Sequence, residues 1–307
     1  MLIGNTNKIP SIVNLLGENN VDSNNGFAFK FTKGADSWFE ASNVAVGNYT
    51  SMALSCWITI DAEFFNDPAP NTSETQHIID KYAFVNEGSE TVQKGYRLIL
   101  EKGLNQGGSI YRRLVFQAGV GNNDATPSTG KAVIPVTDES NPGNDLLPDT
   151  VYLVMASIDD QNMVLQLKGE NNVLRSVLAV APDPMALSNS FLVIGNANPN
   201  NLAAEFGGKV DEVAIWENKK LNQSFPIVIN QIFDWPQYKN LNLQAGSGGN
   251  NFGPPPLWYQ MGEGASILNG EYVLPNIGSY NTTVSSLTGT GTGSNRITPG
   301  LPNELYP

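Results

Sequence analysis

The sequence of 307 residues contains one cysteine and one histidine, and both shortages exclude classes of site. Cys56 has no intrachain disulfide partner, and because it lies within an apolar alternating pattern we predict a buried core thiol. A metal site made of several histidines is excluded. Any Ser/His/Asp or Cys/His catalytic set would have to include His77, which precedes the strand-like "IID" beside a polar loop, and we expect no catalytic role for it.

Charge is also scarce, and basic charge most of all. Charged residues make up 15% of the chain, against about 25% in a typical soluble domain. The chain has 17 basic and 29 acidic residues, which gives a net charge of −12. Such a surface repels phosphate backbones and anionic lipids, so neither nucleic acid nor a membrane is an expected partner.

Long apolar runs are missing as well. No stretch approaches the ~18 apolar residues that a membrane-spanning helix needs. The opening segment "MLIGNTNKIPSIVNLLGENN" has no basic region followed by an apolar core, so we predict no signal peptide. We therefore expect a chain that is made in the cytoplasm and stays soluble.

Short alternating apolar segments, separated by turn residues, dominate what remains. "GFAFKF" places its three phenylalanines on one face, and "SMALSCWITI" places every second residue on one face, namely Met52, Leu54, Cys56, Ile58 and Ile60. "GYRLIL" and "RRLVFQAGV" form one predicted hairpin, "TVYLVMASI" and "NMVLQLKG" another, and "SFLVIGN" and "GKVDEVAIW" complete the set. No long helices alternate with these segments, so the pattern predicts an all-β, two-sheet antiparallel sandwich.

Composition divides the chain into four segments. We predict an N-terminal arm at 1–25, a sandwich at 26–238, a linker at 239–256 and an extended C-terminal tail at 257–307. The tail has too few apolar residues for a core of its own. Arm and tail are therefore expected to lie against the sandwich itself or against neighbouring subunits.

Within the sandwich segment we expect one short helix at 224–234, where Ser224 can cap the first turn and Pro226 suits it. Three long loops are also predicted, and loops of this length usually carry function or tolerate insertions; they cover 61–77, 84–95 and 121–150.

The stretch "GGKVDEVAIWENKKL" at 207–221 carries three carboxylates. On a regular strand Asp211 shares a face with Val213, Ile215 and Glu217, and Glu212 lies on the other face with Ala214 and Trp216. Asp211 and Glu217 would be roughly 20 Å apart, whereas glycosidase acids lie about 5–9.5 Å apart. These acids therefore cannot act as a pair with each other, which leaves open a pair with an acid elsewhere in the chain. We expect a structural role for Asp211.

Aromatic and acidic loop residues supply the remaining candidates. Trp38 and Tyr49 are the candidate glycan contacts, and the wider set of exposed aromatics is predicted to include Trp235, Trp258 and Tyr259. Trp57 and Trp216 lie inside strands and are expected in the core or on the sheet surface. Calcium is compatible with acidic loops but is not placed by any spacing, and no cofactor is required; the loop aspartates are Asp36, Asp124, Asp138, Asp145, Asp159 and Asp160.

Taken in order, these segments resemble a LamG-like (concanavalin A-like lectin/glucanase) jelly-roll domain over about 25–235. The similarity is greatest at the family's Gly-x-Ile-Asp-Glu-Val-x-Ile signature and the short helix that follows, where this chain has Gly208, Asp211, Glu212, Val213 and Ile215. The resemblance implies a two-sheet jelly roll. Family members bind glycans, proteins or calcium through rim loops, or are purely structural, and share no universal catalytic residue. Lys209 stands where a glucanase would carry a second acid, which counts against a glucanase.

The segments "LWYQMGEGASI" and "LPNIGSYNTTVSSLTG" resemble the part that follows such domains in structural proteins of tailed phages, with Glu263 in place of an Asp. This resemblance implies a non-enzymatic structural protein of a virus particle, such as a capsid decoration, fibre or tail component. Its location would be the virion, in an oligomer or larger assembly, where arm and tail contact other virion proteins. A glycan-binding lectin module is the alternative, and a glycoside hydrolase is a third and weaker one.

Overall fold

The computed structural model describes most of the chain between residues 27 and 299; the ranges are 27–34, 38–41, 43–66, 74–121, 129–137, 144–171, 173–197, 204–224, 226–233, 252–261, 266–268, 271–279, 287–290 and 296–299. The strands within these ranges are β1 (Phe27–Phe31), β2 (Trp38–Ala41), β3 (Met52–Ile60), β4 (Glu74–Glu87), β5 (Glu90–Leu104), β6 (Ile110–Val120), β7 (Thr129–Pro135), β8 (Tyr152–Asp159), β9 (Asn162–Gly169), β10 (Leu174–Val180), β11 (Val193–Ile194), β12 (Gly208–Glu217), β13 (Leu257–Tyr259), β14 (Ser266–Leu268), β15 (Glu271–Leu274), β16 (Leu287–Thr290) and β17 (Arg296–Pro299). Two short helices accompany them, α1 (Ala62–Asn66) and α2 (Ile227–Phe233).

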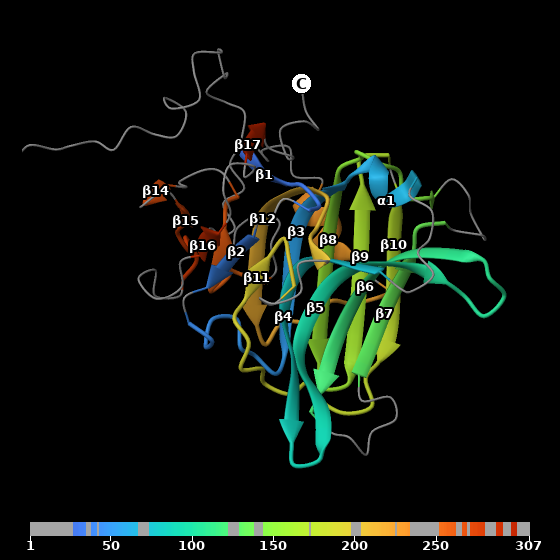
Figure 1. Ribbon diagram of the computed structural model, residues 1–307, viewed down its shortest axis with the longest axis vertical. Helices are drawn as coiled ribbons and strands as arrows, with labels where there is room; N and C mark the ends of the chain where they lie inside the picture. The colour runs from blue at the N-terminus through green and yellow to red at the C-terminus, as the bar shows by residue number, and fades with distance from the viewer. Residues whose placement is uncertain are drawn as a thin grey trace, which may run out of the picture.

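The strands form two antiparallel sheets (Figure 1). The eight-stranded sheet has the order β10-β9-β8-β3-β12-β1-β17, with β13 paired to β12 beside β1. The nine-stranded sheet has the order β14-β15-β16-β2-β11-β4-β5-β6-β7. The prediction of an all-β, two-sheet antiparallel sandwich is confirmed.

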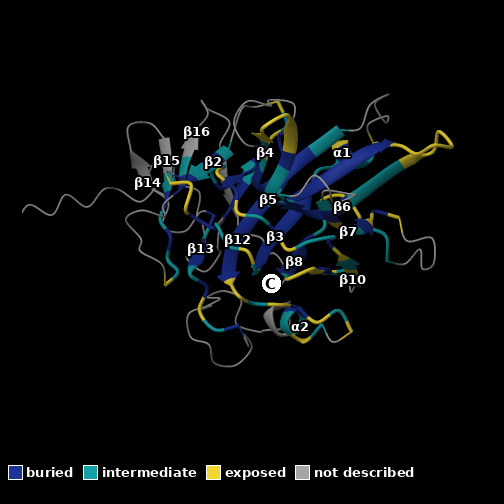
Figure 2. Cartoon of the chain, turned by 90° about the horizontal axis from the view of Figure 1, so that it is seen from below, coloured by how far each residue is buried: buried dark blue, intermediate teal, exposed yellow. Residues whose placement is uncertain are grey.

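The main core lies between the two sheets and follows the predicted alternation. Phe29 and Phe31 of β1 are buried in it, and so are all five alternate residues of β3, from Met52 to Ile60. Cys56 is a buried free thiol, as predicted. Figure 2 shows the central strands β3, β8 and β12 as the most continuously buried part of the fold.

A second apolar cluster covers the outer face of the eight-stranded sheet. Trp57 of β3, Trp216 of β12 and Met155 of β8 are buried there, and Ile229 of α2 and Phe252 pack over them. The Trp216 indole N–H also donates a hydrogen bond to the Gly253 carbonyl at 2.9 Å. Both faces of this sheet are therefore apolar, which explains why its strands are nearly continuous apolar runs in the sequence.

The C-terminal residues that the structure describes are built into the sandwich. β13 pairs with β12, β17 pairs with β1, and β16 pairs with β2 and carries β15 and β14. The described residues of the predicted tail therefore lie against the sandwich itself.

Several predicted boundaries differ from the structure. The expected loop at 84–95 is the end of the long β4–β5 hairpin, closed by Gly88 and Ser89, which projects beyond the sandwich (Figure 1). The expected loops at 61–77 and 121–150 contain α1 and the start of β4, and β7, respectively. The predicted helix is present as α2, whereas α1 was not predicted.

The structure describes little of the predicted arm and linker. The predicted arm at 1–25 lies outside the described residues, as does most of the predicted linker at 239–256. Among the described residues, no helix is long and apolar enough to span a membrane.

Candidate ligand-binding site

The prediction that Asp211 shares a face with Val213 and Ile215 is wrong, because β12 contains a β-bulge. Asp211 lies opposite Trp57 and Ala214 lies opposite Ser55, so two residues of β12 oppose the single residue between them on β3. Glu212 has a positive φ of 49°, the left-handed conformation of a bulge. The extra residue returns Val213 and Ile215 to the main core and leaves Asp211 on the outer face with Trp57.

Both acids at the bulge are buried and hydrogen-bonded. Oδ1 of Asp211 accepts the backbone N–H of Glu212 at 2.8 Å and that of Met261 at 3.3 Å. The Glu212 carboxylate accepts the Trp258 indole N–H through Oε2, and the Gln260 side-chain amide through Oε1 at 3.2 Å. β1 pairs with the first part of β12 and β13 with the last part, so the bulge sits where these two strands meet. The acids join β13 and the residues after it to β12.

The predicted glycan contacts lie partly inside the fold. Trp38 is half-buried on β2, and its indole nitrogen is buried without an acceptor among the described residues. Tyr49 is half-buried against the main core. Trp258 and Tyr259 are buried in β13, so the prediction that they are exposed is wrong. Trp235 lies outside the described residues.

His77 is buried inside β4 and not beside a loop, which corrects the sequence prediction. Its Nε2 lies 3.2 Å from the Thr75 hydroxyl, and its Nδ1 bonds Oδ2 of Asp80. The other oxygen of Asp80 accepts the Tyr82 N–H at 2.7 Å. The register of β4 shifts between His77 and Ile79, so these bonds stabilise an irregular part of the strand. The Thr75 hydroxyl, the His77 imidazole and the Asp80 carboxylate also follow the order of groups in a catalytic triad. Thr75 is therefore the residue to substitute in a test for catalysis.

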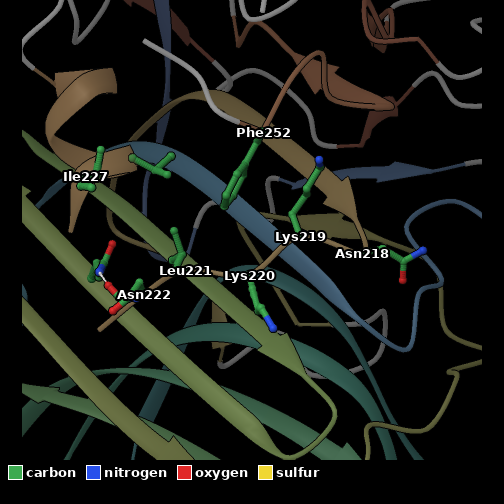
Figure 3. Close-up of a pocket in the computed structure, with 9 residues that line it drawn as sticks. Asn218, Lys219, Lys220, Leu221, Asn222, Ile227 and Phe252 are labelled. Carbon is green, nitrogen blue, oxygen red and sulfur yellow. Dashed lines mark hydrogen bonds between the residues drawn. The ribbon is translucent and has the colours of Figure 1, made fainter. Parts of the chain in front are cut away.

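A pocket of about 480 Å³ lies outside the eight-stranded sheet, beside the second apolar cluster. Its walls come from β9, the loop after β12, α2 and Phe252; the lining residues are Gln166, Asn218, Lys219, Lys220, Leu221, Asn222, Ile227, Val228 and Phe252. Figure 3 shows Phe252 beside Lys219, with Ile227 on the side of α2. The volume is in the range of small-molecule sites, and the lining mixes apolar side chains with amides and lysines.

The loop after β12 is fixed to the sheet beneath it. The Leu221 backbone N–H donates to the Ser157 hydroxyl of β8 at 3.0 Å, and the Leu221 side chain is buried in the second cluster. The Asn222 carbonyl accepts the Gln166 side-chain amide at 2.9 Å. The pocket wall is therefore held by bonds that do not depend on a ligand.

Gln166 lines this pocket and carries an unsatisfied acceptor. Its side chain is fully buried, its Nε2 donates to the Asn222 carbonyl and to the Ser176 hydroxyl at 3.1 Å, and no described residue donates to its Oε1. The amide cannot be rotated to exchange its ends. The Asn222 carbonyl only accepts, and the Ser176 hydroxyl already donates its proton to the Gln223 carbonyl. An unpaired buried carbonyl costs about 1–3 kcal/mol, so a donor from a ligand would be favourable here.

The two lysines of the pocket differ in their partners. Lys220 is exposed and forms a 3.0 Å ion pair with Asp159, which raises the pKa of Lys220. Lys219 is half-buried, and no described residue forms an ion pair or hydrogen bond with it. The unmatched charge of the pocket is therefore the ammonium group of Lys219.

The structure describes only some of the aspartates that are candidates for binding calcium. Asp145, Asp159 and Asp160 are described, and Asp36, Asp124 and Asp138 are not. Across the described part of the chain, no three His, Cys, Asp or Glu side chains gather in a group that could hold a metal ion.

Sequence reasoning did not single out the pocket. A signal was present in "NMVLQLKG", where Gln166 shares the outer face with Val164 and interrupts the apolar run from Met163 to Leu167. Its meaning depended on Phe252, about 30 residues beyond the loop that carries Lys219, and no pattern in the sequence joins these two positions.

No protein-family model matches the sequence, and no curated protein matches it either. Among solved structures, the enzymatically active domain of tailspike protein 2 from bacteriophage CBA120 is 9% identical with a TM-score of 0.41, over 69% of this chain and 27% of that one. The full-length tailspike protein 2 from the Escherichia coli O157:H7 bacteriophage is 8% identical with a TM-score of 0.35, over 73% and 29%. Domains LG4-5 of the mouse laminin α1 chain are 13% identical with a TM-score of 0.32, over 65% and 43%. This chain thus spans less than half the length of each.

Proposed function

We propose that this chain is a non-enzymatic structural subunit of a virus particle, built on a lectin-like sandwich and joined to neighbouring proteins through its N-terminal arm and C-terminal part. The observation that carries the proposal is the position of the C-terminal strands. Among the strands that the structure describes, β17 lies at one end of the eight-stranded sheet and β14 at one end of the nine-stranded sheet. Sheet edges offer backbone N–H and C=O groups to a further strand, so this part of the chain is suited to contacts between subunits.

The acids of the signature support a structural role. Asp211 and Glu212 accept hydrogen bonds from the backbone of Met261 and the indole of Trp258, so both carboxylates join the C-terminal strands to the sandwich. A general acid or base needs its carboxyl group within reach of a substrate proton. In this chain both carboxylates are buried and accept hydrogen bonds from the protein itself.

Purified virus particles test the structural role. Particles from the source of the sequence are analysed by mass spectrometry and by electron microscopy with an antibody against the chain. The proposal predicts a fixed number of copies per particle at a defined position. Absence of the chain from particles would end the proposal.

Catalysis is tested separately on the purified chain. A chromogenic ester and a β-glucan are the substrates, and Thr75→Val and Glu212→Gln are the variants. We expect no turnover by the wild-type chain. Ester turnover that is lost in Thr75→Val would identify Thr75 as a nucleophile activated by His77. Glucan hydrolysis that is lost in Glu212→Gln would identify the chain as a glycoside hydrolase.

A glycan-binding module is the second candidate function, and the pocket beside α2 favours it. The lining combines amide groups, which both donate and accept hydrogen bonds as sugar hydroxyls require, with apolar side chains. A glycan array probed with and without calcium tests this candidate. Binding to no sugar under either condition would remove it.

A further inference from the structure

We infer that the pocket beside α2 takes an acidic sugar, a pyranose that carries a carboxylate, with Lys219 pairing the carboxylate and Gln166 accepting a hydrogen bond from a hydroxyl. The inference rests on the glycan-binding function and names its ligand class. It combines two independent observations, the unmatched ammonium of Lys219 and the buried acceptor of Gln166 that has no donor among the described residues.

The Gln166 carbonyl sets the first requirement. Because the amide nitrogen is held by Asn222 and Ser176, the oxygen keeps its orientation whether or not a ligand is bound. Its ligand must present an O–H or N–H group. A hydroxyl satisfies this requirement, whereas an acceptor-only anion such as sulfate or acetate does not.

Lys219 sets the second requirement. The protein carries a net charge of −12, so anions are repelled by most of its surface. The pocket is an exception, because Lys219 and Lys220 both line it and Asp159 pairs with Lys220 alone. A charge-assisted bond to Lys219 distinguishes a carboxylate-bearing sugar from its neutral counterpart.

The apolar lining sets the third requirement. Leu221, Ile227, Val228 and Phe252 provide carbon surface beside the polar groups, and Ile227 is 51% exposed. A sugar ring has an aliphatic face of C–H groups that can cover this surface, whereas a small inorganic anion has none. An acidic pyranose meets all three requirements in one molecule of suitable size for about 480 Å³.

The test compares three probes that differ only at the carboxylate: methyl glucuronide, its methyl ester and methyl glucoside. Binding to the full chain is followed by NMR titration. We expect the acid to bind at least tenfold more tightly than the ester or the glucoside, and its affinity to fall as salt is added.

Two charge-reversal variants make the test specific. Lys219→Glu is expected to weaken binding of the acid at least tenfold without changing the melting temperature, because Lys219 is half-exposed and has no described partner. Lys94→Glu makes the same change in net charge on the β4–β5 hairpin of the other sheet, where Lys94 pairs with an exposed glutamate, and is expected to bind as wild type. Gln166→Met removes the acceptor, and its melting curve is measured alongside because two internal hydrogen bonds are lost with it.

The outcomes separate this inference from the function on which it rests. Neutral glycans bound on the array, with no effect of Lys219→Glu and no preference for the acid, would overturn the acidic-sugar assignment and leave glycan binding intact. Binding of nothing on the array and of none of the three probes would remove both. N-acetylalanine bound as tightly as the glucuronide would show a carboxylate site without selectivity for sugar, which also overturns the inference.

Discussion

The Glu212 carboxylate accepts the indole N–H of Trp258, a residue 46 positions later, and this buried bond joins the bulge of β12 to β13. The bond depends on the bulge, because the extra residue there places Glu212 out of the regular alternation of β12. The backbone irregularity and the attachment of the C-terminal strands are therefore one feature. Substitutions at Glu212 can separate the contribution of the backbone conformation from that of the hydrogen bond to Trp258.

We predict that Glu212→Gly is more stable than Glu212→Ala by about 1 kcal/mol. Both variants lose the acceptor for Trp258, but alanine must also adopt the left-handed conformation that glycine adopts freely. Free energies of unfolding from urea titrations measure the difference. Ala214→Gly, two residues along the same strand, is the control and should be destabilising, as glycine is in a regular strand. An alanine variant at 212 as stable as the glycine variant would contradict the bulge.

At Asp211 we predict that asparagine is tolerated and alanine is not. The side chain introduced by Asp211→Asn keeps an oxygen that can accept the N–H groups of Glu212 and Met261, at a cost of about 1 kcal/mol for weaker neutral bonds. Asp211→Ala leaves both N–H groups without this acceptor and should cost about 2–4 kcal/mol. Hydrogen exchange of the Met261 amide reports the bond directly. Equal protection of this amide in wild type and Asp211→Ala would show that the carboxylate does not hold it.

The sequence predicts the sandwich well because burial imposes a period of two on each strand. The alternation in β1 and β3 matches the main core residue by residue, from Phe29 to Ile60. The same rule fails at Glu212, because one inserted residue changes the face of everything that follows. "KVDEVAIW" contains no glycine or proline to announce the bulge.

Exposure to solvent explains why the end of the β4–β5 hairpin was predicted as a loop. The outer part of the β4–β5 hairpin is exposed around Glu87 and Glu90, so its sequence is polar and resembles a loop although it is regular strand. The pocket was missed for a different reason. Its residues come from β9, the loop after β12, α2 and Phe252, which meet only in the folded chain.

Two buried ionisable groups, Lys81 and Cys56, make the free energy of unfolding depend on pH in the alkaline range. Lys81 is fully buried and donates to the carbonyls of Val44 and Ser190, both at 2.7 Å, and burial lowers its pKa to about 8. The unfolded value is about 10.4, so between pH 8 and 10.4 the unfolded chain holds a proton that the folded chain has released. Over this window Lys81 makes the free energy of unfolding rise with pH.

Cys56 makes the free energy of unfolding fall as pH rises. Burial raises the pKa of its thiol, so above the unfolded value of about 8.5 the unfolded chain loses a proton that the folded chain keeps. Between pH 8.5 and 9.5 the two effects nearly cancel, so we predict a nearly flat profile for the wild-type chain in this window. In Cys56→Ala the free energy of unfolding should rise between pH 8 and 9.5, by at most about 1.4 kcal/mol per pH unit. Adding Lys81→Met should remove the rise. Urea titrations at four pH values test this, and a falling profile in Cys56→Ala would contradict the assignment to Lys81.

A chain that ends at residue 256 tests the boundary between sandwich and tail. We predict that a chain ending at residue 256 does not fold cooperatively, because 257–307 supplies buried side chains to both apolar clusters, namely Leu257, Trp258, Tyr259, Met261, Leu274 and Leu287. Burial of each large apolar side chain contributes about 1.5–3 kcal/mol, and their sum is comparable with the whole stability of a typical domain, about 5–15 kcal/mol.

Thermal unfolding followed by circular dichroism, together with gel filtration, measures the effect of this truncation. The matched control adds a peptide of residues 257–307 to the truncated chain, which should restore a cooperative transition if the loss comes from the missing strands. A truncated chain that melts cooperatively at the wild-type temperature would show that residues 1–256 fold without 257–307. In that case β13 to β17 would be an attachment to a finished sandwich, and the hydrogen bonds of Asp211 and Glu212 would hold that attachment without supporting the fold.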